Sequence, residues 1–156
     1  MKFISITTVL AVTSFTNSLI YANPSNSPLG YWRTIDDVTN EPKSIILLEG
    51  NDNQITGKVV KILKLDNPSE NPETKVCDKC KGKRHNKPIK GMVILWGVSK
   101  EGDNEWGGGE ILDPKTGKTY SVTLELDNNG KSLNVRGYIG ISLLGRTQTW
   151  ERTTAP

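Results

Sequence analysis

Strict alternation of apolar and polar residues in short segments is the feature that most constrains what this chain can fold into. The clearest case is residues 118–126, where Tyr120, Val122 and Leu124 alternate with Thr119, Ser121 and Thr123. A period of two places successive side chains on opposite faces of a β-strand. Residues 118–126 are therefore predicted to form a strand with one face in a core and the other in solvent.

Similar segments recur along the chain, separated by turn sequences such as Asp113-Pro114-Lys115-Thr116-Gly117 and Asp127-Asn128-Asn129-Gly130. The expected strands are residues 29–35, 44–48, 54–65, 92–96, 105–112 and 118–126, followed by two more within 133–152. About eight short strands without an amphipathic helix predict an all-β domain, either an up-and-down antiparallel barrel or a sandwich. We favour the single barrel because closure leaves no exposed strand edge.

The first 22 residues do not fit the β pattern. Lys2 precedes a broken apolar stretch over residues 3–12, and a second apolar group ends at Ala22, before a polar segment. The flanks and position of this stretch predict a secretory signal peptide over residues 1–22, cleaved after Ala22, and the alternative is a buried N-terminal helix. The apolar stretch is too short and too interrupted to span a membrane as a helix. The domain is then residues 23–156, and the protein is expected to be periplasmic or secreted.

Charge argues against nucleic acid as a partner. The formal net charge is only +3, and Lys2 would leave with the signal peptide. One basic cluster stands out, formed by Lys79, Lys81, Lys83, Arg84 and Lys87. Such a cluster attracts phosphate or an acidic surface, but no aromatic residues interleave with it as single-stranded nucleic acid would require. A solvated loop is the favoured interpretation.

The cluster lies in the longest expected loop, residues 66–90, which contains Cys77 and Cys80. Three functions other than a structural disulfide are open to these two cysteines. A redox CxxC normally lies at the start of a helix, and a zinc site needs about four ligands. A haem-attachment site needs a histidine directly after the second cysteine. The surroundings are charged and turn-like, and Lys81 follows Cys80. Because export exposes thiols to oxidising conditions, we expect a Cys77–Cys80 disulfide that orders the loop.

Catalytic patterns are lacking. His85 is the sole histidine and lies among lysines, and no nucleophile turn is present. Asp36 and Asp37 are adjacent, so they suit a turn better than a pair of carboxyls converging on one bond. We therefore expect no enzymatic activity, no metal and no cofactor.

The last strand mixes aromatic and polar residues on one face, since Arg146, Gln148, Trp150 and Arg152 occupy alternate positions. An inward stripe of this kind suits the lining of a cavity better than a dry core. Glu110 is four residues after Trp106, so strict alternation along the strand (the parity of the residue numbers) places both on the same face, which predicts an inward carboxylate at Glu110. The leading hypothesis is that the barrel interior binds a small apolar or amphipathic ligand.

The expected apolar wall of that site is Trp32, Trp96, Trp106, Tyr120 and Trp150, and Arg146 and Gln148 would meet a polar or anionic end of the ligand. An eight-stranded barrel is near the size at which side chains alone fill the interior. The alternative hypothesis is therefore a structural or interaction module of the cell envelope with a filled core. Its partner would bind the 66–90 loop.

Gly30-Tyr31-Trp32 on the first strand, with Arg146 or Arg152 on the last, resembles the signature of lipocalins and related small barrels. In that family the tryptophan packs across the barrel floor beneath an arginine of the final strand. The resemblance implies that Trp32 meets a last-strand arginine, and we predict Arg146 rather than Arg152.

A second resemblance covers nearly the whole mature chain. GYWRTIDD, CDKCKG, GMVILWG, GGGEILDPKTGKTY and VRGYIGISLLGRTQTWER look like the blocks of an uncharacterised exported bacterial family, domain of unknown function 2147. This resemblance implies a lipocalin-like β-barrel in the cell envelope. It carries no catalytic residues to transfer and implies no particular activity.

Overall fold

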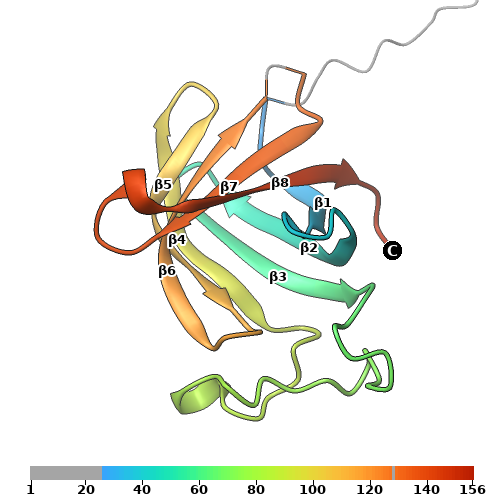
Figure 1. The fold of residues 1–156 in the computed structure, drawn as a ribbon. Coiled ribbons are helices and arrows are strands. Elements are labelled where there is room, and N and C mark those ends of the chain that lie inside the picture. The colour runs from blue at the N-terminus through green and yellow to red at the C-terminus, as the bar shows by residue number, and fades with distance from the viewer. Residues whose placement is uncertain (1–25, 128) are drawn as a thin grey trace, which may run out of the picture.

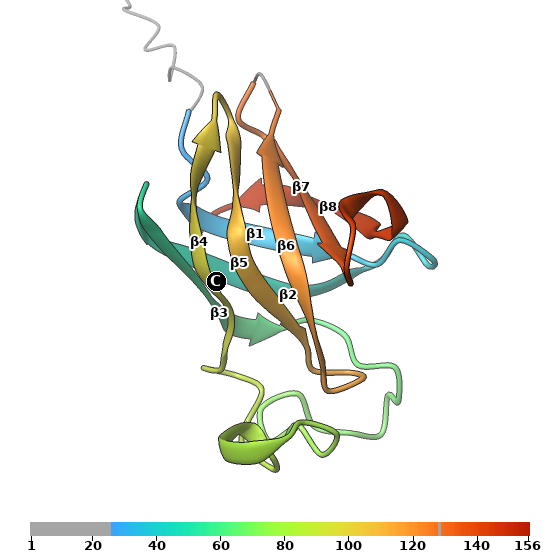
Figure 2. The ribbon, with the colours of Figure 1, turned by 90° about the vertical axis from the view of Figure 1, so that its left-hand side faces the viewer.

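The computed structural model describes residues 26–127 and 129–156, so the expected signal peptide lies outside the described residues. Eight strands pair antiparallel in chain order, and β8 pairs with β1 to close the barrel (Figures 1 and 2). The predicted up-and-down barrel is confirmed. Closure satisfies the backbone groups of every strand, which is why no edge remains to be protected.

The strands are β1 Gly30–Ile35, β2 Pro42–Asn51, β3 Gln54–Ile62, β4 Val93–Gly102, β5 Glu105–Asp113, β6 Lys118–Leu126, β7 Ser132–Tyr138 and β8 Arg146–Thr153. Two short 3-10 helices, η1 Gly82–Arg84 and η2 Ser142–Leu144, lie in the β3–β4 and β7–β8 connections. Within residues 26–127 and 129–156, no helix has the length and hydropathy needed to cross a bilayer.

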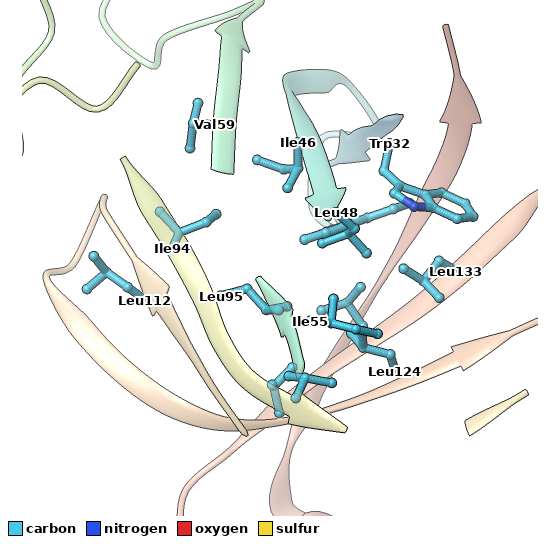
Figure 3. Packing of buried hydrophobic residues seen from close by; sticks show 14 of the residues in the cluster. Trp32, Ile46, Leu48, Ile55, Val59, Ile94, Leu95, Leu112, Leu124 and Leu133 are labelled. Atoms are coloured by element: carbon cyan, nitrogen blue, oxygen red, sulfur yellow. The ribbon is translucent and has the colours of Figure 1, made fainter. Parts of the chain in front are cut away.

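Alternation correctly identifies the inward face of β6. Val122, Leu124 and Leu126 are buried there, whereas Ser121 and Glu125 are exposed. Leu124 is joined in the core by aliphatic residues of the other strands, including Leu48, Ile55, Leu95 and Leu133, and Figure 3 shows these side chains converging between the strands. Burial of these side chains from water supplies the main driving force for the fold.

The up-and-down topology gives the barrel two distinct ends. The chain enters β1 at one end, which we call the closed end, where the β2–β3, β4–β5 and β6–β7 turns also lie. The opposite end, which we call the open end, carries four connections: the β1–β2 turn, the 66–90 loop, the β5–β6 hairpin and the β7–β8 loop (residues 139–145). Alternation alone does not say which residues reach which end.

Glycines break the alternation in β4 and β5. The turn expected after Trp96 is instead strand up to Gly102, with Gly97 at φ +70° and Gly108 at φ +72°. The register shifts between Trp106 and Gly109, and Trp96 pairs with Glu110. Glu110 is consequently exposed, so the inward carboxylate predicted from parity is wrong. A bulge residue moves everything after it to the opposite face.

The 66–90 loop packs along β4, β5 and the hairpin that follows them. Cys77 Sγ lies 3.4 Å from the Pro114 carbonyl oxygen, and a Cβ added to Gly117 would lie 2.0 Å from the Lys79 carbonyl oxygen. Within the loop, Val76 bridges Pro88 in an isolated antiparallel pair. Both cysteines are buried and belong to the hydrophobic core cluster, so the segment is an integral part of the domain.

Cys77 and Cys80 form the predicted disulfide. We expect two alkylatable thiols to appear only after reduction, which mass analysis of alkylated protein with and without a reductant measures. Because the ring is small, reduction should destabilise the fold by less than the ~3 kcal/mol typical of a 15-residue loop. Free thiols in freshly isolated, unreduced protein would contradict the assignment.

Candidate functional site at the open end of the barrel

The closed end is sealed by a tryptophan and an arginine. Trp32 is fully buried, and its Nε1 donates a hydrogen bond of 2.7 Å to the Pro28 carbonyl oxygen. The guanidinium carbon of Arg152 lies 4.2 Å from the centroid of the Trp32 ring. The predicted floor is present, but the prediction of Arg146 as the partner is wrong. The pairing register places Arg152 directly opposite Trp32.

Arg152 also joins three segments of backbone at this end. Its guanidinium donates to the carbonyl oxygens of Ser27 at 2.7 Å and Leu29 at 2.9 Å, and to that of Gly130. Desolvation lowers the pKa of Arg152 from its ordinary value, although the group stays charged at any physiological pH. This guanidinium is used in closing the barrel and is not free to meet a ligand.

Three of the tryptophans expected to line a ligand site fill the core instead. Trp32, Trp106 and Trp150 are at most 2% exposed. Trp150 Nε1 donates to Gln148 Oε1 at 3.4 Å. Within the described residues, Trp106 Nε1 is the one buried side-chain nitrogen or oxygen without a hydrogen-bond partner. A buried donor of this kind costs about 1–3 kcal/mol, so an acceptor near it would be favourable.

Trp96 lies on the outer face of the barrel. Its Nε1 donates to Glu110 Oε2 at 3.0 Å, and the guanidinium carbon of Arg84 lies 4.3 Å from its ring centroid. Arg84 belongs to the 66–90 loop, so this stack fastens the loop to the outside of β4. The structure does not bring Trp96 together with the interior tryptophans.

Towards the open end, the inward-facing side chains become partly exposed. Tyr120 and Ile111 are cross-strand partners, and both are half-buried. A Cβ added to Gly137 would lie 3.5 Å from Tyr120 Cβ and 3.8 Å from Ile111 Cγ2, so Gly137 faces the same space. Gln148 of β8, also half-buried, lies opposite Val135, so the partly exposed inward residues towards this end include a phenol, an aliphatic chain and an amide.

Arg146 stands at the rim beside this group. Its side chain is 64% exposed and forms a bidentate ion pair with Asp37 of the β1–β2 turn. Arg146, with a further hydrogen bond from Gln148, lowers the pKa of Asp37 below its ordinary value. Asp36 behaves as the turn residue expected, accepting hydrogen bonds from the amides of Val38 and Thr39. Tyr120, Gln148 and Arg146 are thus the part of the predicted set that lies at the open end.

A second ion-pair group holds the connections of this end together. Asp66, where the long loop begins, pairs with Lys115 of the β5–β6 hairpin at 2.6 Å and with Lys43 of β2 at 3.1 Å. Lys115, followed by Lys43, lowers the pKa of Asp66. These groups are largely exposed, so each pair contributes little stability. Their effect is to fix where the loops lie around the opening.

Sequence reasoning missed the aliphatic surface at this end. Ile139, Ile141, Leu143 and Leu144 of the β7–β8 loop are all exposed, and Val38 of the β1–β2 turn is 79% exposed. The segment resembles a glycine-rich corner in sequence, and its alternation with polar residues is too short to indicate a face. The sequence feature that could have indicated this surface is the group of four aliphatic residues between Arg136 and Arg146, where no charged residue occurs.

Two of the shallow hollows on the described surface lie outside the barrel. One runs along β8 near Arg33 and Glu151, and the other lies beside the basic loop near Arg84, Lys87 and Met92. The first is not an extension of the open end, because its lining includes Arg152 and Lys131 of the closed end. The open-end group around Tyr120 is the candidate site because its inward side chains, which belong to the predicted set, are only half-buried.

A closed eight-stranded antiparallel barrel with a tryptophan–arginine floor at one end is a lipocalin-like fold. The structure is similar to that of a Helicobacter pylori protein described as belonging to the lipocalin family, HP1028. The TM-score is 0.68 and the identity 22%, over 83% of this chain and 85% of that one, which shows the shared fold. Residues 30–152 match the family described as "Uncharacterized protein conserved in bacteria (DUF2147)", and the chain belongs to this family. A search of curated proteins finds no match.

Proposed function

We propose that this barrel binds a small apolar or amphipathic molecule through its open end. The observation that carries the proposal is the change from fully buried to half-buried inward side chains at Ile111, Tyr120 and Gln148. Such a mixture of apolar surface with a few placed polar groups is typical of small-molecule sites. The apolar part of the ligand would lie against Ile111 and Tyr120, and its polar end would meet Gln148 and Arg146.

The buried tryptophans set the depth of the proposed site. Trp32 and Trp150 already pack in the core, so the ligand would not reach the floor without displacing them. The unpartnered Nε1 of Trp106 lies near the closed end, where β5 begins, so water rather than this ligand would supply its acceptor. Export, which stays a prediction from the first 22 residues, would place this binding in the cell envelope.

The proposal includes no catalytic step. His85 is exposed, and its Nδ1 lies 3.0 Å from the Cys80 carbonyl oxygen, which assigns the ring to ordering the disulfide loop. It is far along the chain from the open-end group and belongs to a different connection.

Gly137 offers the sharpest test. A methyl group there makes ordinary contacts with Tyr120 and Ile111, whereas a leucine would fill the space beside them. We expect native mass spectrometry of protein purified without detergent to show one small molecule per chain in wild type and in Gly137→Ala. The Gly137→Leu variant should fold, as circular dichroism checks, and be empty. A ligand retained by Gly137→Leu would contradict the proposed site.

The second candidate is the interaction module with a filled core, which the packing of Trp32, Trp106 and Trp150 favours. Its partner surface would be the 66–90 loop, where Lys79, Lys81, Lys83 and Lys87 are exposed. Wild-type protein that is repeatedly empty in the same measurement would favour this function over ligand binding.

A further inference from the structure

The β7–β8 loop exposes more aliphatic surface than any other connection of the described chain. Leu143 is 82% exposed, Leu144 77%, Ile139 69% and Ile141 60%. Isolated exposed aliphatic residues are normal, but contiguous exposed apolar surface usually marks a contact with a partner or a membrane. The loop projects from the barrel beside β7 and β8 (Figure 2), and we call this exposed segment, residues 139–145, the tip.

Hydrogen bonds from Arg136 and between backbone groups of the loop hold the backbone of this tip in place. Arg136 of β7 donates from Nε to the Ser142 carbonyl oxygen at 2.8 Å and from Nη2 to the Leu143 carbonyl oxygen at 3.1 Å. The Leu144 and Gly145 amides donate to the carbonyl oxygens of Ile141 and Ser142, respectively. Polar backbone groups entering a bilayer must be satisfied inside the protein. This loop meets that condition at its exposed apex.

Charge near the loop favours an anionic surface. No aspartate or glutamate occurs between residues 128 and 150, and Arg136 lies at the root of the loop. Arg146 follows the loop but is paired with Asp37, so among the described residues the unpaired cations beside the loop are Arg136 and exposed Lys118, which begins the neighbouring strand β6. Cations at the base of an apolar tip attract the negative headgroups of lipids such as phosphatidylglycerol.

The composition of the loop makes a protein partner a poorer match than a lipid surface. Residues 139–145 contain no aromatic residue, whereas protein-binding hot spots are rich in tryptophan, tyrosine and arginine. The one arginine side chain beneath the tip is used in bracing it. We propose that the β7–β8 loop docks the protein on a lipid bilayer by inserting Leu143, Leu144 and their neighbours at the interface between headgroups and acyl chains.

Vesicle flotation tests this proposal with phosphatidylcholine vesicles and with phosphatidylcholine–phosphatidylglycerol vesicles. We expect the chain to float with both and more strongly with the anionic ones. The double variant Leu143→Ser/Leu144→Ser should lower the partition coefficient by about a hundredfold or more, since two leucine side chains that would be buried on docking are replaced by polar ones. The control Leu63→Ser/Val93→Ser replaces two aliphatic residues outside the loop, each 37% exposed, and circular dichroism checks that it folds. It should change partition by less than about threefold, because neither residue would be buried on docking.

Equal flotation of wild type and the Leu143/Leu144 variant would overturn the proposal, as would a wild type that floats with neither vesicle. A wild-type dimer that becomes monomeric in the double variant, without vesicle binding, would instead assign the tip to a second copy of the chain. The proposal does not depend on the ligand site, because Leu143 and Leu144 are exposed and are not residues of that site.

Discussion

Replacing Trp32 by alanine is expected to lower the free energy of unfolding by about 3–5 kcal/mol. The ring is fully buried, packs in the core, and holds Pro28 through its Nε1 hydrogen bond. Removal would leave a large cavity at the closed end and would free the guanidinium that stacks on it. Equilibrium urea unfolding, monitored by circular dichroism, measures the effect.

The two arginines of β8 provide a matched pair for the same experiment. Arg152→Ala should cost about 2–3 kcal/mol, because charge-assisted hydrogen bonds to three carbonyl oxygens and the stack on Trp32 are lost together. Arg146→Ala should cost less than about 1 kcal/mol, because its pair with Asp37 is exposed. A larger loss for Arg146→Ala than for Arg152→Ala would contradict the assignment of the floor.

Gly117→Ala is expected to lower the free energy of unfolding by about 2–4 kcal/mol, the sum of a strained backbone and overpacking. Gly117 has φ +70°, and its added Cβ would lie 2.0 Å from the Lys79 carbonyl oxygen. Because the added methyl group would clash with backbone atoms rather than with a flexible side chain, the β5–β6 hairpin and the disulfide loop would have to move apart. The same urea titration measures this loss.

Gly82→Ala is the control, because Gly82 lies in the same loop at φ +58° with nothing within 4 Å of an added Cβ. It should cost only about 1 kcal/mol, from backbone strain alone. Equal effects of the two substitutions would mean that the disulfide loop does not pack against the hairpin.

The β-barrel was predictable because it depends on local signals. The alternation in β6 identifies its buried face, and about eight short strands between turn residues predict a barrel or a sandwich, of which the barrel is found. The disulfide was predictable because its cysteines are neighbours in sequence and because the first 22 residues predict export to an oxidising compartment.

Predicting which arginine packs on Trp32 requires information that the alternation of residues along the strand does not contain. Arg146 and Arg152 share the same parity, and only the β1–β8 register decides which of them lies opposite Trp32. Likewise, Trp96 and Glu110 face outward because positive-φ glycines at 97 and 108 shift the alternation, and a sequence pattern does not say which glycines form bulges.

The candidate site was predicted in part for a related reason. The expected set of aromatic residues treats every inward position as equivalent, whereas depth in the barrel separates them. Trp32, Trp106 and Trp150 are buried, and Tyr120 and Gln148 lie near the open end. Depth depends on strand stagger around the whole barrel, which is a non-local property.

Amide NMR with sodium decanoate, an amphipathic anion, tests the central claim most directly. The account predicts saturable shifts of the Tyr120, Gly137 and Gln148 amides, with the Trp32 and Trp96 indole signals unchanged, since those indoles lie at the floor and on the outer face. Saturable shifts confined to the 66–90 loop, or no saturable shift at Tyr120, Gly137 and Gln148, would contradict binding at the open end.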